Sequence, residues 1–201
     1  MLRIQVHILD EKQNPPFDLE VPAEIPVLEL DRLVSVALGW DVDASGQVQR
    51  HMMRSLTTSR VLHSWESLAD AQVWDGTTLH FITILAAYVI MPSGKQIPLL
   101  QNSVLIGRST DNAMTNPDEM LDLANEAEGN TVSRQHARLS YARGQWQLAH
   151  LSQTNQTRVN DQLIDSDVRM ALRPGDRIEV GGVELQFHHG LPLGQAIQPV
   201  P

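Results

Sequence analysis

The first ten residues alternate between apolar and polar side chains. One face of the stretch LRIQVHIL carries four apolar side chains, those of Leu2, Ile4, Val6 and Ile8. A period of two is typical of a β-strand with one buried face. Alternation resumes at Phe17, Leu19 and Val21, after Asn14-Pro15-Pro16, which has the composition of a turn. These two segments predict a β-hairpin.

The period changes to that of a helix after Pro26. Proline is favoured in the first turn of a helix, and Gly39 is suited to the position after the last turn. Apolar residues recur between them on one helical face, at Leu30, Leu33, Val34, Ala37 and Leu38. The pattern predicts an amphipathic helix with this single stripe. Strand-like pieces follow near 47–54 and 59–63, then a turn at Asp75-Gly76 and a last strand that ends near residue 85.

The pattern of apolar and polar residues changes again from residue 88, where short apolar runs alternate with turns. We predict nine strands there by pattern: 88–91, 96–100, 104–106, 137–141, 145–148, 157–159, 170–172, 177–180 and 183–187. Dipeptides rich in glycine or proline separate many of them, among them Arg143-Gly144, Pro174-Gly175 and Gly181-Gly182. Many short strands at such spacing favour an all-β sandwich.

Composition narrows the classes of function. The chain has 201 residues, no cysteine and a net charge of −9. Disulfides, thiolate catalysis and Cys-ligated metals are excluded. The negative charge argues against nucleic acid and anionic membranes as general partners. The N-terminus lacks the pattern of a signal peptide, and no apolar run approaches membrane-spanning length. We therefore expect a cytoplasmic protein with no direct membrane insertion.

Residues 1–85 have the element order strand, strand, helix, strand, strand, short turn, strand. Together with the stretch SLADAQVWDGTTLHF at 67–81, this order resembles a ubiquitin-like β-grasp domain. A conjugated modifier of that family needs a free C-terminal Gly-Gly. Here Gly181-Gly182 lies between two strand-like runs, as a hairpin turn does. The resemblance therefore implies a docking domain, which we place at residues 1–86.

Four motifs in the second half occur in a specific order. They are Gly107-Arg108, Ser133-Arg134-Gln135-His136, Thr154-Asn155-Gln156-Thr157-Arg158-Val159-Asn160, and Pro174-Gly175-Asp176. Their series resembles a forkhead-associated (FHA) domain, here over residues 87–190. Membership implies a β-sandwich of about eleven strands whose loops bind phosphothreonine peptides. The fold class is thus an α+β β-grasp domain followed by an all-β sandwich, with a Pro-containing tail at 191–201 that we expect to be disordered.

The resemblance assigns roles to the residues in these motifs. Arg108 and Ser133 are implied as phosphate ligands, and Asn155 as a clamp on the peptide backbone. This set suits the chemistry, because phosphothreonine offers about −1.5 to −2 charge and three strong acceptors, which one arginine and several neutral donors can satisfy. Arg134 either contacts the phosphate or braces the loop. Thr154 either donates to the phosphate or bonds its own turn.

Three further residues are expected to support the site, namely Gly107, His136 and Asn160. His136 is assigned a structural role beneath the loops. A hydrolase reading of Ser133 with His136 fails because the sequence has no nucleophile elbow and no evident orienting acid. The sequence shows neither a metal-binding motif nor a nucleotide-binding loop. We therefore expect that the protein is not an enzyme and binds no cofactor.

The chain departs from the FHA pattern at two positions. Gln156 and Asp161 stand where the family usually has glycine, and a positive φ there would strain both residues. The segment 109–130 is long and acidic, with an apparent insertion around 115–119. It is either a solvated loop or a barrier to acidic target peptides through like-charge repulsion. Its acidic residues are Asp118, Glu119, Asp122, Glu126 and Glu128.

We therefore expect a non-enzymatic adaptor in Ser/Thr-kinase-linked signalling or assembly. Its partners are expected to be a phosphothreonine-containing protein and a second protein bound by the ubiquitin-like domain. The alternative is a phosphate-independent assembly module with a vestigial pocket. The combination of domains also resembles small bacterial proteins linked to type VII secretion, which is an analogy at the level of fold.

Overall fold

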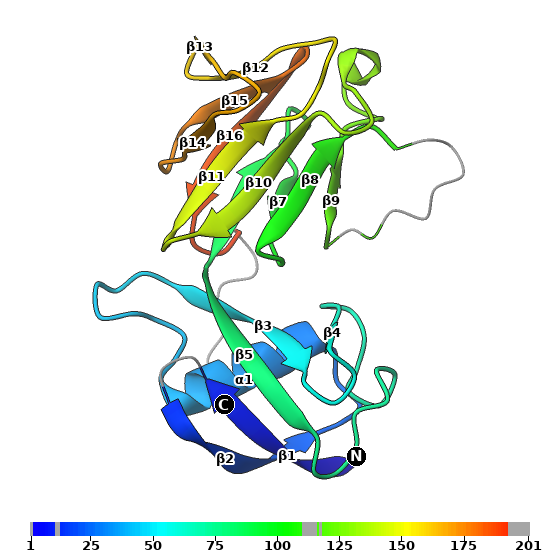
Figure 1. Ribbon diagram of the computed structural model, residues 1–201, viewed down its shortest axis with the longest axis vertical. Helices are drawn as coiled ribbons and strands as arrows, with labels where there is room; N and C mark the ends of the chain where they lie inside the picture. The colour runs from blue at the N-terminus through cyan, green and yellow to red at the C-terminus, as the bar shows by residue number, and fades with distance from the viewer. Residues whose placement is uncertain (1, 11–12, 110–115, 117, 193–201) are drawn as a thin grey trace. The chain divides into compact units, whose positions relative to one another are not determined.

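The structure is a computed structural model that describes residues 2–10, 13–109, 116 and 118–192. The chain divides into two compact units, Met1–Ile84 and Leu85–Pro201 (Figure 1). Residues 115 and 117 of the predicted insertion and most of the predicted tail, from residue 193 onward, lie outside the described residues. No helix within the described part of the chain is long and apolar enough to cross a membrane.

The first unit is a five-stranded sheet with one helix, in the order β2-β1-β5-β3-β4. Strands β1 and β2 are antiparallel, and β1 is parallel to β5. This topology places the first and last long strands side by side at the centre of the sheet (Figure 1). The elements are β1 (Arg3–Asp10), β2 (Gln13–Pro22), α1 (Val27–Leu38), β3 (Gln49–Ser55), β4 (Arg60–Val61) and β5 (Thr78–Leu85).

The prediction that Asn14-Pro15-Pro16 forms a turn is wrong. Residues 13–22 form one strand, and Gln13 already pairs with Asp10. Two adjacent prolines are tolerated for two reasons: β2 is the edge strand, so the backbone position that points away from β1 needs no partner, and the pairing with β1 is interrupted opposite this segment. The register with β1 shifts between Ile8 and Asp10, which marks a bulge opposite this segment.

The helix forms where the periodicity predicts it, but its buried face is different. Leu30 and Val34 are buried, whereas Leu33 is 37% exposed and Ala37 also faces solvent. Polar residues take part of the inner face, because Asp31 and Ser35 are buried with His51 of β3. The Ser35 hydroxyl donates to Asp31 Oδ1 at 2.9 Å and lies 2.9 Å from His51 Nδ1. This hydrogen-bonded set makes burial of polar groups tolerable.

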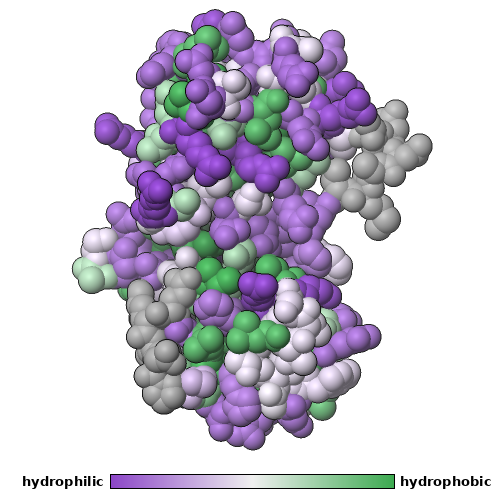
Figure 2. All heavy atoms as spheres, in the orientation of Figure 1, coloured by the Kyte–Doolittle hydropathy of each residue, from purple (hydrophilic) through white to green (hydrophobic). Residues whose placement is uncertain are grey.

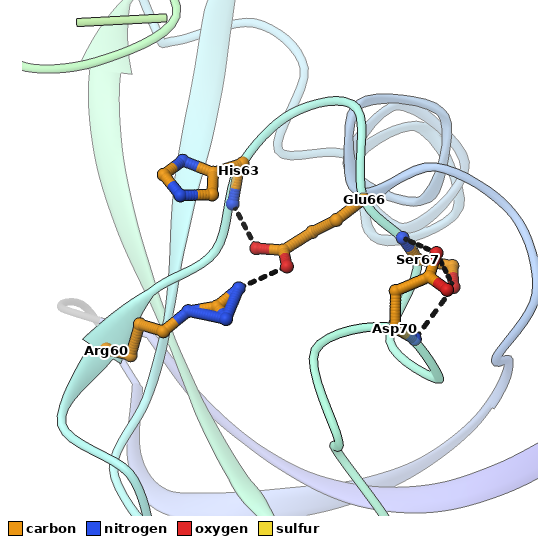
Figure 3. Close-up of polar contacts among 5 residues, drawn as sticks. All are labelled: Arg60, His63, Glu66, Ser67 and Asp70. Atoms are coloured by element: carbon orange, nitrogen blue, oxygen red, sulfur yellow. Dashed lines mark hydrogen bonds and ion pairs between the residues drawn. The ribbon is translucent and has the colours of Figure 1, made fainter. Parts of the chain in front are cut away.

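The segment after β4 is held by two carboxylates (Figure 3). Glu66 is buried and accepts from the backbone N–H of His63 at 2.5 Å and from the Arg60 guanidinium. Four residues later, Asp70 accepts from the Ser67 hydroxyl at 2.7 Å, and Asp70 N–H donates back to the same hydroxyl. The side-chain and backbone bonds from Ser67 lower the pKa of Asp70. These contacts fix the segment 67–73, which buries Leu68 in the core.

The second unit is a sandwich of two sheets within its described residues. One sheet has five strands, in the order β14-β11-β10-β8-β9, and the other has six, in the order β13-β12-β15-β16-β6-β7. The strands are β6 (Ala87–Ile90), β7 (Gln96–Pro98), β8 (Ser103–Gly107), β9 (Met120–Asp122), β10 (Ala137–Ala142), β11 (Gln145–His150), β12 (Thr157–Val159), β13 (Gln162–Leu163), β14 (Arg169–Ala171), β15 (Arg177–Val180) and β16 (Val183–His189). A short 3-10 helix, η1, spans Gly129–Thr131.

The inner faces of the two sheets form one continuous core. Trp146 and Phe187, one from each sheet, are fully buried with ring centroids 6.5 Å apart. The Trp146 indole N–H donates to Leu85 O at 2.9 Å, which satisfies its only polar atom. Hydrophilic residues dominate the visible surface of this unit (Figure 2). Burial of both aromatics contributes roughly 1.5–3 kcal/mol each and fixes the frame that carries the loops.

Candidate functional site

Three hydroxyl groups meet where the loop before β10 faces the loop after β11. Ser133 Oγ lies 2.7 Å from Ser152 Oγ and 3.1 Å from Thr154 Oγ1. Ser152 is 8% exposed and accepts from the backbone N–H groups of Thr154 and Asn155, both at 3.2 Å. Since a hydroxyl can donate and accept, this cluster can turn neutral donors toward an anionic ligand.

Arg108 follows β8 and is tied to the backbone of the same loop. Its N–H donates to Ser133 O and its Nε to Val132 O, both at 3.1 Å. Both terminal nitrogens of its guanidinium lack a hydrogen bond or ion pair to any residue that the structure describes. The side chain is half-buried. Arg108 is therefore oriented through Nε while its two outer nitrogens remain available to a ligand.

Gly107 is required for a close approach of two chain segments. A Cβ atom at this position would lie 2.1 Å from Arg134 O and 2.8 Å from Arg134 C. Its backbone conformation is not left-handed, so the requirement is one of space alone. Both colliding atoms belong to the backbone, which cannot swing away as a side chain can. The close approach holds the loop that carries Ser133 against the end of β8.

His136 is fully buried and uses both ring nitrogens to join the two loops. Nδ1 accepts from Ser133 N–H at 3.0 Å, and Nε2 lies 3.1 Å from Gln156 O. The ring is therefore the neutral tautomer with hydrogen on Nε2. Burial is the main cause that lowers the pKa of His136. The Ser133 hydroxyl is not bonded to this imidazole, so the pair lacks the contact that activates a serine nucleophile.

Asn155 lies at the edge of the same loop and faces η1. Its Nδ2 donates to Thr131 O, and its Oδ1 has no hydrogen bond to a described residue. Thr131 Oγ1 in turn accepts from Gly182 N–H at 2.9 Å. The amide is therefore fixed through its nitrogen, and its oxygen remains available as an acceptor for a peptide N–H.

The structure places the remaining predicted residues at the rim or away from this cluster. The Arg134 side chain is exposed and makes no polar contact with any residue in the described ranges. Asn160 lies in the turn between β12 and β13, where Nδ2 donates to Asp176 and Oδ1 accepts from Arg177 N–H. Asn160 thus anchors the hairpin to the Pro-Gly-Asp segment and contacts none of the five candidate ligands.

The two departures from the FHA pattern have different consequences. Gln156 does not adopt a positive φ, so the strain expected there is absent. Asp161 does, with φ of 68°, and it follows Asn160 at 48°. Two successive positive φ values define the tight turn that joins paired strands. Asp161 is therefore strained where glycine would fit, but its carboxylate accepts a hydrogen bond from the Arg177 guanidinium, which partly offsets the cost.

The acidic residues of the long segment are mostly committed to contacts within the domain. Asp122 accepts from the Ser109 hydroxyl and from the N–H groups of Ser109 and Ala124. Burial, the largest single cause, acts to raise the pKa of Asp122, but these three bonds together lower it. Asp118 is 4% exposed, and Glu126 accepts from the Ser93 hydroxyl at 3.2 Å. Glu128 differs, because its carboxylate faces an open pocket beside Asn155.

Two residues of the site were not predicted from the sequence, Ser152 and Thr131. The composition of Ser152-Gln153-Thr154 is typical of a turn closed by a serine hydroxyl, so the turn itself could have been predicted from the sequence. Nothing local in the sequence indicates that Ser152 would reach Ser133. The described residues contain no group of three or more His, Asp or Glu side chains placed to hold a metal ion.

In comparisons with known proteins, two segments of the chain match family models. The family model for the FHA domain matches residues 104–181, which include the hydroxyl cluster, Arg108 and Asn155. The chain carries an FHA domain. The family model described as WXG100 protein secretion system (Wss), protein YukD, matches residues 3–81. A ubiquitin-like domain therefore precedes the FHA domain, as the sequence predicts.

Solved structures similar to the chain include several FHA domains. One, studied for phosphothreonine-dependent FHA domain interactions, is 25% identical, with 54% of this chain and 99% of that chain covered and a TM-score of 0.40. An FHA domain of Arabidopsis thaliana is 17% identical, with coverages of 55% and 92% and a TM-score of 0.43. Mycobacterium tuberculosis EmbR with a low-affinity phosphopeptide is 22% identical, with coverages of 78% and 29% and a TM-score of 0.42. A search of curated proteins gave no significant match.

Proposed function

We propose that the FHA domain binds phosphothreonine on a partner protein and that the chain is a non-enzymatic adaptor. The observation that carries this proposal is the Arg108 guanidinium. It is oriented through Nε to Val132 O next to the Ser133–Ser152–Thr154 hydroxyl cluster. The match to the FHA family over residues 104–181 supports the same function.

The geometry suits a phosphate dianion. The two outer nitrogens of Arg108 supply charge-assisted hydrogen bonds, which are about twice as strong as neutral ones. Ser133 and Thr154 supply neutral hydroxyl donors, so the ligand charge is balanced without a second buried cation. Asn155 Oδ1 accepts a backbone N–H of the bound peptide. Arg134, exposed at the rim, adds a second positive charge at longer range.

We further propose that the ubiquitin-like domain docks a second protein, which makes the chain a bridge. The match to a family of the WXG100 secretion system supports a link to type VII secretion. We propose in addition a bacterial, cytoplasmic setting in which a Ser/Thr kinase supplies the phosphothreonine. Two exposed tryptophans, Trp65 and Trp74, are 61% and 54% accessible on this domain and are suited to contact a partner.

Calorimetric titration with matched phosphothreonine and unmodified peptides tests the phosphate-dependent function. We expect Arg108→Ala to weaken phosphopeptide binding by more than about 1.5 kcal/mol, because it removes charge-assisted bonds. Arg143→Ala is a matched control, since Arg143 is exposed in the turn at the far end of β10 and β11. Affinity capture with wild type and Arg108→Ala, compared by mass spectrometry, identifies the partner. Unchanged assembly by Arg108→Ala would instead favour a phosphate-independent module with a vestigial pocket.

A further inference from the structure

An open pocket of about 450 Å³ adjoins the proposed phosphate site. It shares Thr154 and Asn155 with that site, and its lining includes the turn between β15 and β16 but not Arg108. Its lining comprises Glu128, Thr131, Thr154, Asn155, Gln156, Glu179, Gly181 and Gly182. A peptide held by Arg108 and Asn155 therefore has a second cavity within reach of a flanking side chain.

The only charged residues in this lining are two glutamates, Glu128 and Glu179. Neither carboxylate has a hydrogen bond or ion pair with a residue in the described part of the chain. Arg158 lies directly across from Glu179 in the sheet, but its guanidinium donates to Gln156 Oε1 at 2.9 Å. Arg177 is paired with Asp161 and Glu184. Neither arginine forms an ion pair with Glu128 or Glu179.

Glu128 is held firmly at the wall of the pocket. Its φ is 63°, and its carbonyl oxygen accepts from both the N–H and the hydroxyl of Thr131. Its carboxylate packs against Gly182, where an added Cβ would lie 2.3 Å from Glu128 Oε2. Glu179 is half-buried on β15, a strand inside the six-stranded sheet. Both charges are therefore presented by ordered backbone.

We propose that this pocket receives a lysine or arginine side chain of the phosphothreonine peptide, which gives the domain selectivity for a basic residue near the phosphothreonine. This inference rests on the proposed function. Two unpaired carboxylates attract a cation and repel an acidic side chain, so the preference contains both an attractive and a repulsive part. The target then carries a negative phosphate that binds Arg108 and a positive side chain that binds Glu128 and Glu179.

The test uses a phosphothreonine peptide with alanine at all flanking positions, in which each position is changed in turn to lysine or to glutamate. We expect lysine to bind about 3- to 30-fold more tightly than glutamate at one position or two adjacent positions, from the strength of partly exposed ion pairs. The variant with Glu128→Gln and Glu179→Gln together should lose most of that ratio and still bind the all-alanine phosphopeptide. Glu184→Gln is the matched control, because Glu184 lies on β16 directly opposite Glu179 of β15 but does not line the pocket.

The outcomes separate this inference from the proposed function. Equal affinity for lysine and glutamate at every position, or a ratio unchanged in the double variant, would overturn the inference. Binding of the all-alanine phosphopeptide would leave the proposed function in place in either case. Failure of every phosphopeptide to bind more tightly than its unmodified form would overturn both.

Discussion

Replacement of Gly107 by alanine separates positioning of the phosphate site from the chemistry of its ligands. Gly107 has no side chain that could contact the phosphate. An alanine Cβ would nevertheless lie 2.1 Å from Arg134 O and 3.2 Å from Ser133 O. Since an unstrained contact between these atoms needs more than 3 Å, the backbone of the loop must retreat by about 1 Å. The displaced segment carries the Ser133 hydroxyl and the carbonyl groups that orient Arg108.

Two magnitudes are expected for Gly107→Ala from this overlap and from general energetics. Overpacking against backbone should cost about 1–3 kcal/mol in the free energy of unfolding of the FHA domain. A phosphate bond to a charged donor contributes about 1.5–3 kcal/mol, and a shift of the loop spoils at least one such bond. Affinity for a phosphothreonine peptide should therefore fall about 10- to 100-fold, although Arg108, Ser133 and Asn155 are all intact.

Gly144→Ala provides the matched control for this experiment. Gly144 has φ of 77° in the turn between β10 and β11, and a Cβ there would contact nothing within 4 Å. Alanine should lower stability by about 1–2 kcal/mol through backbone strain alone, with affinity unchanged. Titration calorimetry and differential scanning calorimetry measure both quantities on the full chain. Wild-type affinity in Gly107→Ala, or an equal loss in Gly144→Ala, would refute the role assigned to the close approach.

Three further predictions concern strain and protonation. Asp161→Gly should raise the free energy of unfolding by about 0.5–1 kcal/mol, because relief of positive-φ strain exceeds the loss of an exposed ion pair; a destabilised variant in scanning calorimetry would contradict this. The pKa of His136 is lower in the folded chain than in the unfolded chain, so on acidification the imidazole is protonated first in the unfolded chain. The contribution of the neutral, buried His136 to stability is therefore complete above about pH 6.5. It falls as the pH drops toward the lowered pKa of the folded chain. An NMR titration that finds His136 protonated at or above the ordinary histidine pKa would overturn the assignment. Phosphopeptide affinity should also decline below about pH 6, as the phosphate gains its second proton, and a flat titration series would exclude a dianion-specific site.

Periodicity predicted the elements of the ubiquitin-like domain better than their buried faces. The hairpin, the helix and the last strand form where alternation or a 3.6-residue period indicates them. The helix turns Asp31 and Ser35 inward instead of Leu33 and Ala37, because His51 on a distant strand supplies the hydrogen bonds that two buried polar groups need. Similarly, Pro15 and Pro16 join a strand because β2 is at the edge of the sheet and its pairing with β1 is interrupted there. Both outcomes depend on neighbours remote in sequence.

The same limit applies to the FHA domain. Its eleven described strands agree with the expected sandwich, and the motif order located Gly107, Arg108, Ser133, His136 and Asn155 in one connected set. Ser152 could not be predicted as a site residue, because its partner Ser133 lies nineteen residues earlier and contacts it only in the folded sandwich. The φ angles of Gln156 and Asp161 could not be predicted either, because the residue type limits a backbone angle but does not determine it.

The most direct test of phosphothreonine recognition is the ratio of dissociation constants for one peptide sequence with and without phosphate on its threonine, measured by titration calorimetry on the full chain. We expect the phosphorylated peptide to bind at least about 100-fold more tightly, since Arg108 and the hydroxyl cluster contribute at least two charge-assisted bonds. A ratio near one would contradict the function proposed for this site.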